Sequence, residues 1–155
     1  MQQGTVEQVD DGDACFSCSS EKNTAQAIVA ALVKLPEQTK NRIVYLQDFT
    51  STQQELVAEI SRQTGKKFTV TVVNGQELVK RKQAEGSAGD EFANYALVSL
   101  AIVSGSRYGT LFGEEYGCEI MTEKLGLRKV TLADEVADAL RRLQSNGRQV
   151  VISNS

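Results

Sequence analysis

The stretch TQQELVAEISRQTGKKFTVTVVNG, residues 52–75, decides the fold class. Thr52 and Glu55 have the spacing of a capping box and an apolar stripe follows them, which predicts a helix over 52–64. Apolar residues and threonines then alternate with a period of two, which predicts a strand over 67–73. A helix that leads directly into a strand indicates an α/β fold.

The segments around this unit extend the same pattern. A helix is predicted over 20–35, and its apolar residues fall on one helical face: Ala25, Ile28, Val29, Leu32 and Val33. The apolar run within 42–47 is typical of a buried strand. Gly65 stands where a glycine ends a helix, and Asn74 with Glu77 fits a helix N-cap better than a hairpin turn.

The two ends of the chain carry weaker signals. An acidic turn at 10–13 separates two extended segments, 5–9 and 13–18, and predicts a hairpin. Thr131 is the predicted cap of a last helix, whose apolar face holds Leu132, Val136, Leu140 and Leu143. A short terminal strand is predicted over 150–152.

Between these ends lies the most apolar part of the chain. Gly86 and Gly89 interrupt the helix that Asn74 begins, and the next helix, over 91–104, is apolar nearly all round, as expected of a helix at the centre of the core. A loop with a glycine at every fourth position follows over 105–117. Aromatic residues of this helix and loop are the candidate substrate-pocket residues: Phe92, Tyr95, Tyr108, Phe112 and Tyr116. They suit an apolar pocket with a hydroxyl rim, although core packing explains them equally well.

The composition favours one globular domain over residues 1–155, long enough to bury a core without disulfides. The net charge of −3 gives no overall attraction to nucleic acid, and the basic clusters read best as solvated helix faces. No signal peptide or membrane-spanning run is visible, and three cysteines suggest reduced thiols. We therefore expect a cytoplasmic location, with neither nucleic acid nor a membrane as partner.

The chain has no histidine, which excludes Ser/His/Asp and Cys/His nucleophile pairs and HExxH zinc sites. Cys15 and Cys18 have the spacing of a redox or zinc pair, but in an extended segment they point to opposite faces, and Cys118 is the one further cysteine. Ordinary thiols are the favoured interpretation. We predict no catalytic residue and no metal-binding residue in this chain.

The chain also lacks the residues that usually support hydride transfer. The dinucleotide fingerprint GxGxxG does not occur, and acidic residues stand beside the glycines that come nearest to it. No tyrosine is followed four residues later by the lysine of classical short-chain dehydrogenases. We therefore predict no cofactor-binding residue.

Several short motifs occur in an order that resembles one family. They are a helix, a proline and a strand over 17–46, the helix opening FTSTQQEL over 49–56, the helix exit TGKK over 64–67, and the glycine-aromatic and LGL motifs between 108 and 127. Together they resemble the isoflavone-reductase-like (NmrA-like) proteins over nearly the whole chain. Gln54 departs from the family pattern, because asparagine is usual there.

The resemblance implies a partial Rossmann-type sheet of few, mostly parallel strands with packed helices, corresponding to the C-terminal, substrate-side half of the family fold. Family members are NAD(P)-binding proteins of the atypical short-chain dehydrogenase type, and some are redox-sensing regulators. Their fingerprint and their reductase lysine belong to the N-terminal half. We therefore expect that NADP or NAD serves a full-length member and that this chain alone binds neither.

Two functions remain open. The first is the substrate-binding half of an NAD(P)H-dependent oxidoreductase, catalytically silent alone, which takes an apolar small molecule. The second is a regulatory or interaction module that forms a homo-oligomer or binds a protein partner over an exposed sheet edge. In either case the chain is expected to be a piece of a longer reductase or a short protein derived from one.

Overall fold

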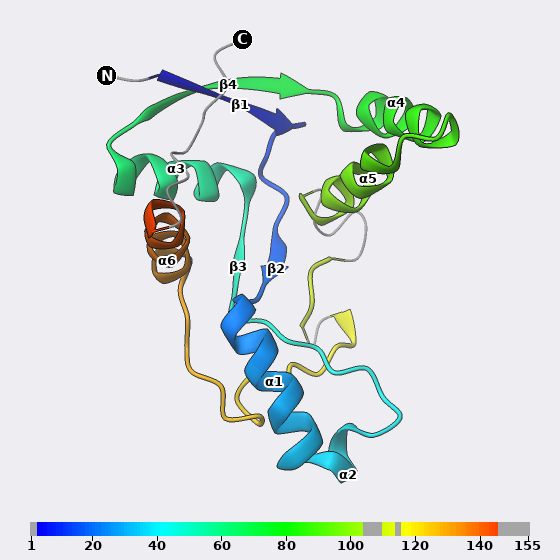
Figure 1. Cartoon of the computed structure of the whole chain (residues 1–155), viewed down its shortest axis with the longest axis vertical. Helices are drawn as coiled ribbons and strands as arrows, with labels where there is room; N and C mark the ends of the chain where they lie inside the picture. The colour runs from blue at the N-terminus through cyan, green and yellow to red at the C-terminus, as the bar shows by residue number, and fades with distance from the viewer. Residues whose placement is uncertain (1–2, 104–109, 114–115, 146–155) are drawn as a thin grey trace.

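The computed structural model describes residues 3–103, 110–113 and 116–145 and shows short strands with packed helices (Figure 1). In chain order the elements are β1 (Gln3–Val9), β2 (Phe16–Cys18), α1 (Glu21–Val33), α2 (Pro36–Thr39), β3 (Phe49–Ser51), α3 (Gln53–Thr64), β4 (Lys67–Val73), α4 (Gly75–Ser87), α5 (Glu91–Val103) and α6 (Leu132–Ser145). The predicted class, an α/β fold with a small parallel sheet and packed helices, is confirmed. The strand predicted over 150–152 lies outside the described residues.

The described strands form two separate two-stranded sheets. β1 pairs with β4 in parallel along its whole length, with Val9 opposite Val73. β2 pairs with β3 in the antiparallel sense, with Cys18 opposite Phe49. The predicted hairpin between 5–9 and 13–18 is therefore wrong, because its two strands belong to different sheets.

A tight turn after β1 explains this outcome. Asp10 and Gly12 both have positive φ, 51° and 68°, and the Gly12 N–H donates to the Val9 carbonyl at 3.2 Å. The Gly12 carbonyl then accepts a hydrogen bond from the Gln54 N–H at 3.1 Å, which fixes the turn at the start of α3. The chain is thereby directed into the second sheet instead of folding back along β1.

The strand predicted over 42–47 is reduced to a single bridge between Tyr45 and Ile120. Its apolar residues Val44 and Leu46 do pack against the core. The backbone of Gln47 is bound by the side chain of Thr122, as described below, rather than by a neighbouring strand. The apolar run was therefore a sign of burial and not of sheet pairing.

The predicted caps of the middle helices are confirmed. Thr52 accepts from the Glu55 N–H at 3.1 Å, while the Glu55 carboxylate accepts from the Thr52 N–H at 3.0 Å. Gly65 ends α3 with a left-handed φ of 66°. At the start of α4, Asn74 accepts from the Glu77 N–H at 3.0 Å.

α1 packs on the core with its smallest residues. The buried cluster joins α1 to the segment around residue 121 and consists of Ala27, Ala30, Met121 and Leu125. The larger apolar residues of α1 lie on the opposite side and are well exposed: Ile28 (59%), Val29 (60%), Leu32 (72%) and Val33 (73%). The apolar stripe predicted from the sequence therefore lies on the outward face of α1, although an apolar stripe on a helix is ordinarily buried.

α5 is also more exposed than predicted. It packs against α4 along one side and buries Ala93 and Leu100 (Figure 1). Four large apolar residues of its other side are exposed: Phe92, Tyr95, Val98 and Ile102. The prediction that this helix lies at the centre of the core is wrong, because only one of its faces has a neighbour among the described residues. None of the described helices combines the length and apolarity needed to cross a bilayer.

Candidate functional site

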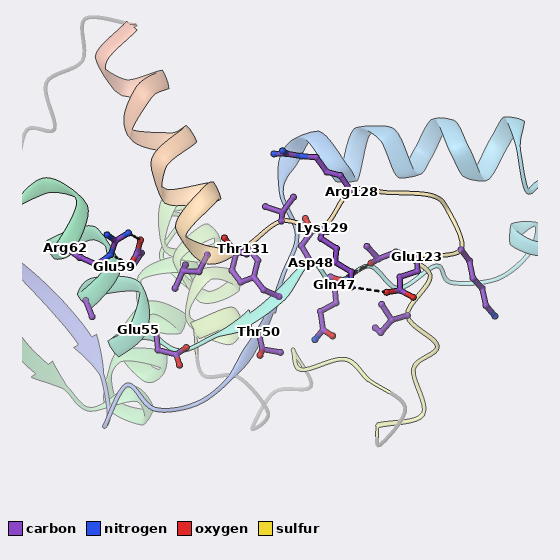
Figure 2. Close-up of a pocket in the computed structure, with 17 residues that line it drawn as sticks. Gln47, Asp48, Thr50, Glu55, Glu59, Arg62, Glu123, Arg128, Lys129 and Thr131 are labelled. Atoms are coloured by element: carbon purple, nitrogen blue, oxygen red, sulfur yellow. Dashed lines mark hydrogen bonds and ion pairs between the residues drawn. The ribbon is translucent and has the colours of Figure 1, made fainter.

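A cleft of about 1080 Å³ opens between α3, the start of β3 and the segment 120–132 (Figure 2). It brings together three parts of the chain that are far apart in the sequence. α3 contributes one face from Glu55 to Arg62, β3 contributes the floor, and the segment before α6 closes the opposite side. A concave site built from separate segments is the usual form of a small-molecule site.

Asp48 anchors the floor of the cleft to α1. Its carboxylate accepts from the Ser20 N–H at 2.8 Å and from the side-chain amide of Asn23 at 2.8 Å. The same amide of Asn23 donates to the Arg128 carbonyl at 2.9 Å, so one side chain joins α1, the floor and the opposite wall. The carboxylate at the start of α1 also lies favourably in the helix dipole.

Thr122 fixes the opposite wall to the floor. Its hydroxyl oxygen accepts from the Gln47 N–H at 3.0 Å, and the hydroxyl donates to the Gln47 carbonyl at 3.0 Å. Thr122 is buried, so these two bonds are sheltered from water. They hold two segments 75 residues apart in the sequence without a sheet ladder.

The α3 wall is lined by a fixed ion pair. Arg62 donates to the Glu59 carboxylate at 2.6 and 2.8 Å (Figure 2). Gln63 donates to the same carboxylate at 2.6 Å. These bonds, from Arg62 first and Gln63 second, lower the pKa of Glu59 to about 2. The carboxylate therefore stays ionised near neutral pH and is poorly matched to general acid catalysis.

The rim of the cleft carries both signs of charge. Lys129 lies 3.8 Å from Glu123, with both side chains highly exposed (Figure 2). Lys124, which also lines the cleft, pairs with Glu119. Exposed pairs of this kind contribute little to binding or stability. Between the charged rims, Phe49, Ile120 and Leu132 supply apolar surface. The lining suits a small molecule with an apolar body and a polar edge.

The cysteine behind the floor is not a nucleophile at neutral pH. Burial, and next the nearby Asp48 carboxylate, raise the pKa of the Cys18 thiol to about 11. Cys15 and Cys118 are free, like Cys18. Within the described part of the chain, no group of three or more His, Cys, Asp or Glu side chains is arranged to hold a metal ion.

The predicted pocket aromatics that the structure describes do not line the cleft and are not gathered at one place. Phe92 and Tyr95 are 87% and 76% exposed on α5, and Tyr116 is half exposed. Phe112 instead packs on Tyr45, with ring centroids 5.2 Å apart. Tyr108, the fifth predicted residue, falls outside the described residues. The aromatic pocket thus stays a prediction, and the cleft is a separate site.

The residues that line the cleft were not predicted as a site from the sequence. The face of α3 that lines it recurs at helical spacing: Glu55, Ala58, Glu59 and Arg62. This spacing could have indicated the cleft from the sequence, because a mostly polar helix face points away from the core and an alanine within it leaves room for a ligand. The contribution of Thr122 has no local signal, since it depends on a partner 75 residues away.

Protein carboxylates occupy the N-terminal ends of the longer helices, where a bound nucleotide would ordinarily place its phosphates. Each of the five helices of twelve or more residues has a carboxylate that accepts from backbone N–H groups at its start. The carboxylates belong to Asp48 at α1, Glu55 at α3, Asp10 at α4, Asp90 at α5 and Asp134 at α6. A dinucleotide pyrophosphate ordinarily binds at a helix start of this kind. In the described part of the chain those positions hold protein carboxylates.

The fold resembles part of an NADPH-dependent quinone oxidoreductase. The solved structure of that Escherichia coli enzyme, described as a new type, matches with a TM-score of 0.61 and 19% identity over 88% of this chain. Its complex with NADPH matches with a TM-score of 0.57 and 19% identity over 86%.

The likeness to the quinone oxidoreductase shows the fold and covers only part of that enzyme. The chain spans about half the length of the solved structures, 46% and 45% of their chains. No family model and no curated protein matches the sequence. These matches confirm the α/β fold that the family resemblance predicts.

Proposed function

We propose that this chain is the substrate-binding part of an NAD(P)H-dependent oxidoreductase of the isoflavone-reductase-like kind, and that it is catalytically silent alone. One observation carries the proposal: the chain matches the NADPH-dependent quinone oxidoreductase over 88% of its own length but only 46% of that enzyme. The cofactor-binding part is then expected to come from additional polypeptide.

The helix starts support the part of this proposal that assigns nucleotide binding to additional polypeptide. Asp10 accepts from the Gly75 N–H at 2.9 Å, directly after the parallel strand β4. In dinucleotide-binding folds a strand-to-helix turn, the one after the first strand, receives the pyrophosphate on a glycine-rich loop. A carboxylate there repels phosphate and uses the donor that phosphate would need.

The cleft supports the substrate side of the proposal. Phe49, Ile120 and Leu132 offer apolar surface to a flat ring. The hydroxyl group of Thr50 also lines the cleft (Figure 2). A quinone has this shape, with an apolar ring and carbonyl oxygens that accept hydrogen bonds. Quinones are therefore the first substrate class to test.

The test is a pair of calorimetric titrations of the purified chain, one with NADPH and NADH and one with 1,4-naphthoquinone. We expect no nucleotide binding and measurable quinone binding. Leu132→Glu is expected to abolish the quinone signal, because it places a charge on the apolar surface of the cleft. Tyr95→Ala on α5 is the matched control and should leave the signal unchanged.

Two results would contradict the proposal. Micromolar NADPH binding by this chain would mean that it holds a nucleotide site of a different kind. Quinone binding that survives Leu132→Glu but is lost in Tyr95→Ala would move the substrate site from the cleft to the predicted aromatic pocket.

A second candidate function is a regulatory or protein-interaction module without enzymatic activity. The exposed large apolar residues of α1 and α5 favour it, since exposed apolar patches often mark protein-interaction sites. This function predicts a stable oligomer and no ligand in the cleft. Light scattering on the titrated sample distinguishes it, because an oligomer that binds neither quinone nor nucleotide fits only the second candidate.

A further inference from the structure

Glu59 is the most sheltered carboxylate of the cleft that has room for a further partner. Its side chain is only 15% exposed, although it lines the cleft. The side chain of Glu123 on the opposite wall is 86% exposed, and Glu55 is also exposed. The fourth lining carboxylate, Asp48, uses both of its oxygens to hold the start of α1. A hydrogen bond to Glu59 therefore competes with less water than one at the rim.

Three N–H donors hold the Glu59 carboxylate in place. Oε1 accepts from Arg62 Nη2 and from Gln63 Nε2, both at 2.6 Å, and Oε2 accepts from Arg62 Nε at 2.8 Å. An ionised carboxylate offers about four lone-pair sites. Within the part of the chain that the structure describes, Oε2 has no second donor. One acceptor site of a fixed side chain thus remains for a ligand.

Gln63 brings this acceptor next to the apolar part of the cleft. The Nε2 group that donates to Glu59 also donates to the Ala133 carbonyl at 2.8 Å. Ala133 directly follows Leu132, which lines the cleft. One amide group therefore joins the carboxylate of α3 to the first turn of α6. A ring that lies against Leu132 has a fixed anion within reach of its edge.

The charge state of Glu59 makes it an acceptor and not a donor. Arg62 first, and Gln63 second, lower its pKa to about 2, so the group carries no proton near neutral pH. A ligand hydroxyl donates to such a group in a charge-assisted hydrogen bond, which is stronger than a bond between neutral groups. A quinone carbonyl or an ether oxygen has no hydrogen to donate. The carboxylate repels the lone pairs of both.

We propose that Glu59 is a ligand-binding residue of the cleft and that its Oε2 atom accepts a hydrogen bond from a hydroxyl group on the ligand ring. The cleft then favours phenols and hydroquinones over quinones of the same size. A quinone that takes up a hydride from NAD(P)H and a proton from water becomes a hydroquinone. In a complete reductase the product is therefore held more tightly than the substrate.

The inference rests on the proposed function, because it concerns the same cleft and the same class of ring. It adds which redox form the cleft prefers and which residue decides the preference. The two fail separately. A chain that binds the quinone but does not prefer a hydroxyl group contradicts only the inference, while a chain that binds neither quinone nor phenol contradicts both.

The first experiment compares three ligands by calorimetric titration of the purified chain: 1-naphthol, 1-methoxynaphthalene and 1,4-naphthoquinone. The first two differ only by methylation of the hydroxyl group. We expect 1-naphthol to bind about tenfold more tightly than either of the other two, because it alone donates to the carboxylate. Equal affinities for 1-naphthol and 1-methoxynaphthalene in the wild type would overturn the proposal before any variant is made.

Glu59→Gln tests the assignment to this residue, because it removes the charge at nearly constant size. The affinity for 1-naphthol should fall about tenfold, to that of 1-methoxynaphthalene, whose own affinity should not change. A merely structural role of Glu59 would instead weaken both ligands alike and would overturn the proposal.

Glu85→Gln on α4 is the matched control. Glu85 also pairs with a basic residue three positions away, Lys82 at 2.6 Å, but it does not line the cleft. This variant should keep the preference for 1-naphthol, and circular dichroism should show native helix content in both variants. A preference that survives Glu59→Gln, or that is lost in Glu85→Gln, would also overturn the proposal.

Discussion

The side-chain amide of Asn23 donates a hydrogen bond to the carboxylate of Asp48 at 2.8 Å, and this contact joins the start of α1 to the floor of the cleft. Asn23 is only 1% exposed, and its amide also donates to the Arg128 carbonyl at 2.9 Å. The other side-chain atom, Oδ1, has no hydrogen-bond partner in the described structure. The donor side of this amide thus connects α1 to two parts of the cleft.

Asn23→Ala is expected to lower the free energy of unfolding by about 1–3 kcal/mol. The change removes the Asn23 donor from the Arg128 carbonyl and leaves the Asp48 carboxylate with the Ser20 N–H alone. Urea unfolding followed by circular dichroism measures the loss. Gln83→Ala on the exposed side of α4 is the control and should change the free energy little. Equal values for the two variants would show that the Asn23 contacts contribute nothing.

Arg62→Ala is expected to raise the pKa of the Glu59 carboxyl from about 2 toward its ordinary value of 4.5. Because the pKa is depressed in the folded chain, the stabilisation is complete above about pH 4.5 and is lost as the pH falls toward 2. Carbon-13 NMR titration of the Glu59 carboxyl measures the shift. Arg81→Ala, which removes only a 3.8 Å contact with Glu85, should leave the Glu59 pKa in place. A low pKa that persists without Arg62 would assign the effect to Gln63.

Cys18 is expected to react with a disulfide reagent much more slowly than Cys15 at pH 8. The pKa of its thiol is raised to about 11, by burial first and Asp48 second, so little thiolate is present. Because the pKa of Cys18 is raised in the folded chain, the protonated thiol contributes fully to stability when the pH is below the ordinary pKa of 9.0. This contribution is lost as the pH rises through about 11. Reaction rates of variants that keep a single cysteine test this, and equal rates for Cys18 and Cys15 would contradict it.

Gly65→Ala is expected to lower the free energy of unfolding by about 1 kcal/mol. Gly65 ends α3 with φ at 66°, where a side chain is strained although no other atom lies within 4 Å of the new Cβ. Thermal unfolding should therefore show a lower melting temperature. Gly65→Asn should lose less, because asparagine adopts the left-handed region more readily. An unchanged melting temperature for Gly65→Ala would mean that the turn relaxes at no cost.

The residues around α3 show what sequence reasoning predicts well. The helix over 52–64, its capping box, the glycine that ends it and the strand over 67–73 all form as predicted. The N-cap at Asn74 does so too. The caps and the helix end depend on residues at most four positions apart, so the local sequence supplies both partners of each of these interactions. The strand was recognised from its local alternation, although its pairing partner β1 lies far away in the sequence.

The predictions that failed concern choices between distant partners. The extended segment 5–9 was recognised, but its pairing with β4, some sixty residues later, was not. The run within 42–47 was recognised as buried, but Thr122 and not a strand binds it. None of the cleft was predicted as a site, because its walls come from three segments that only the folded chain brings together.

The amino-acid sequence by itself determined that this chain is an α/β protein, where its middle helices begin and end, and that it lacks histidine chemistry and a dinucleotide fingerprint. Only the tertiary structure decided which face of α1 meets the core. The alanines of α1 fit closely against Met121 and Leu125, so the larger apolar residues point outward. Helical periodicity shows that a stripe exists, while the space left by distant side chains decides on which side it is buried.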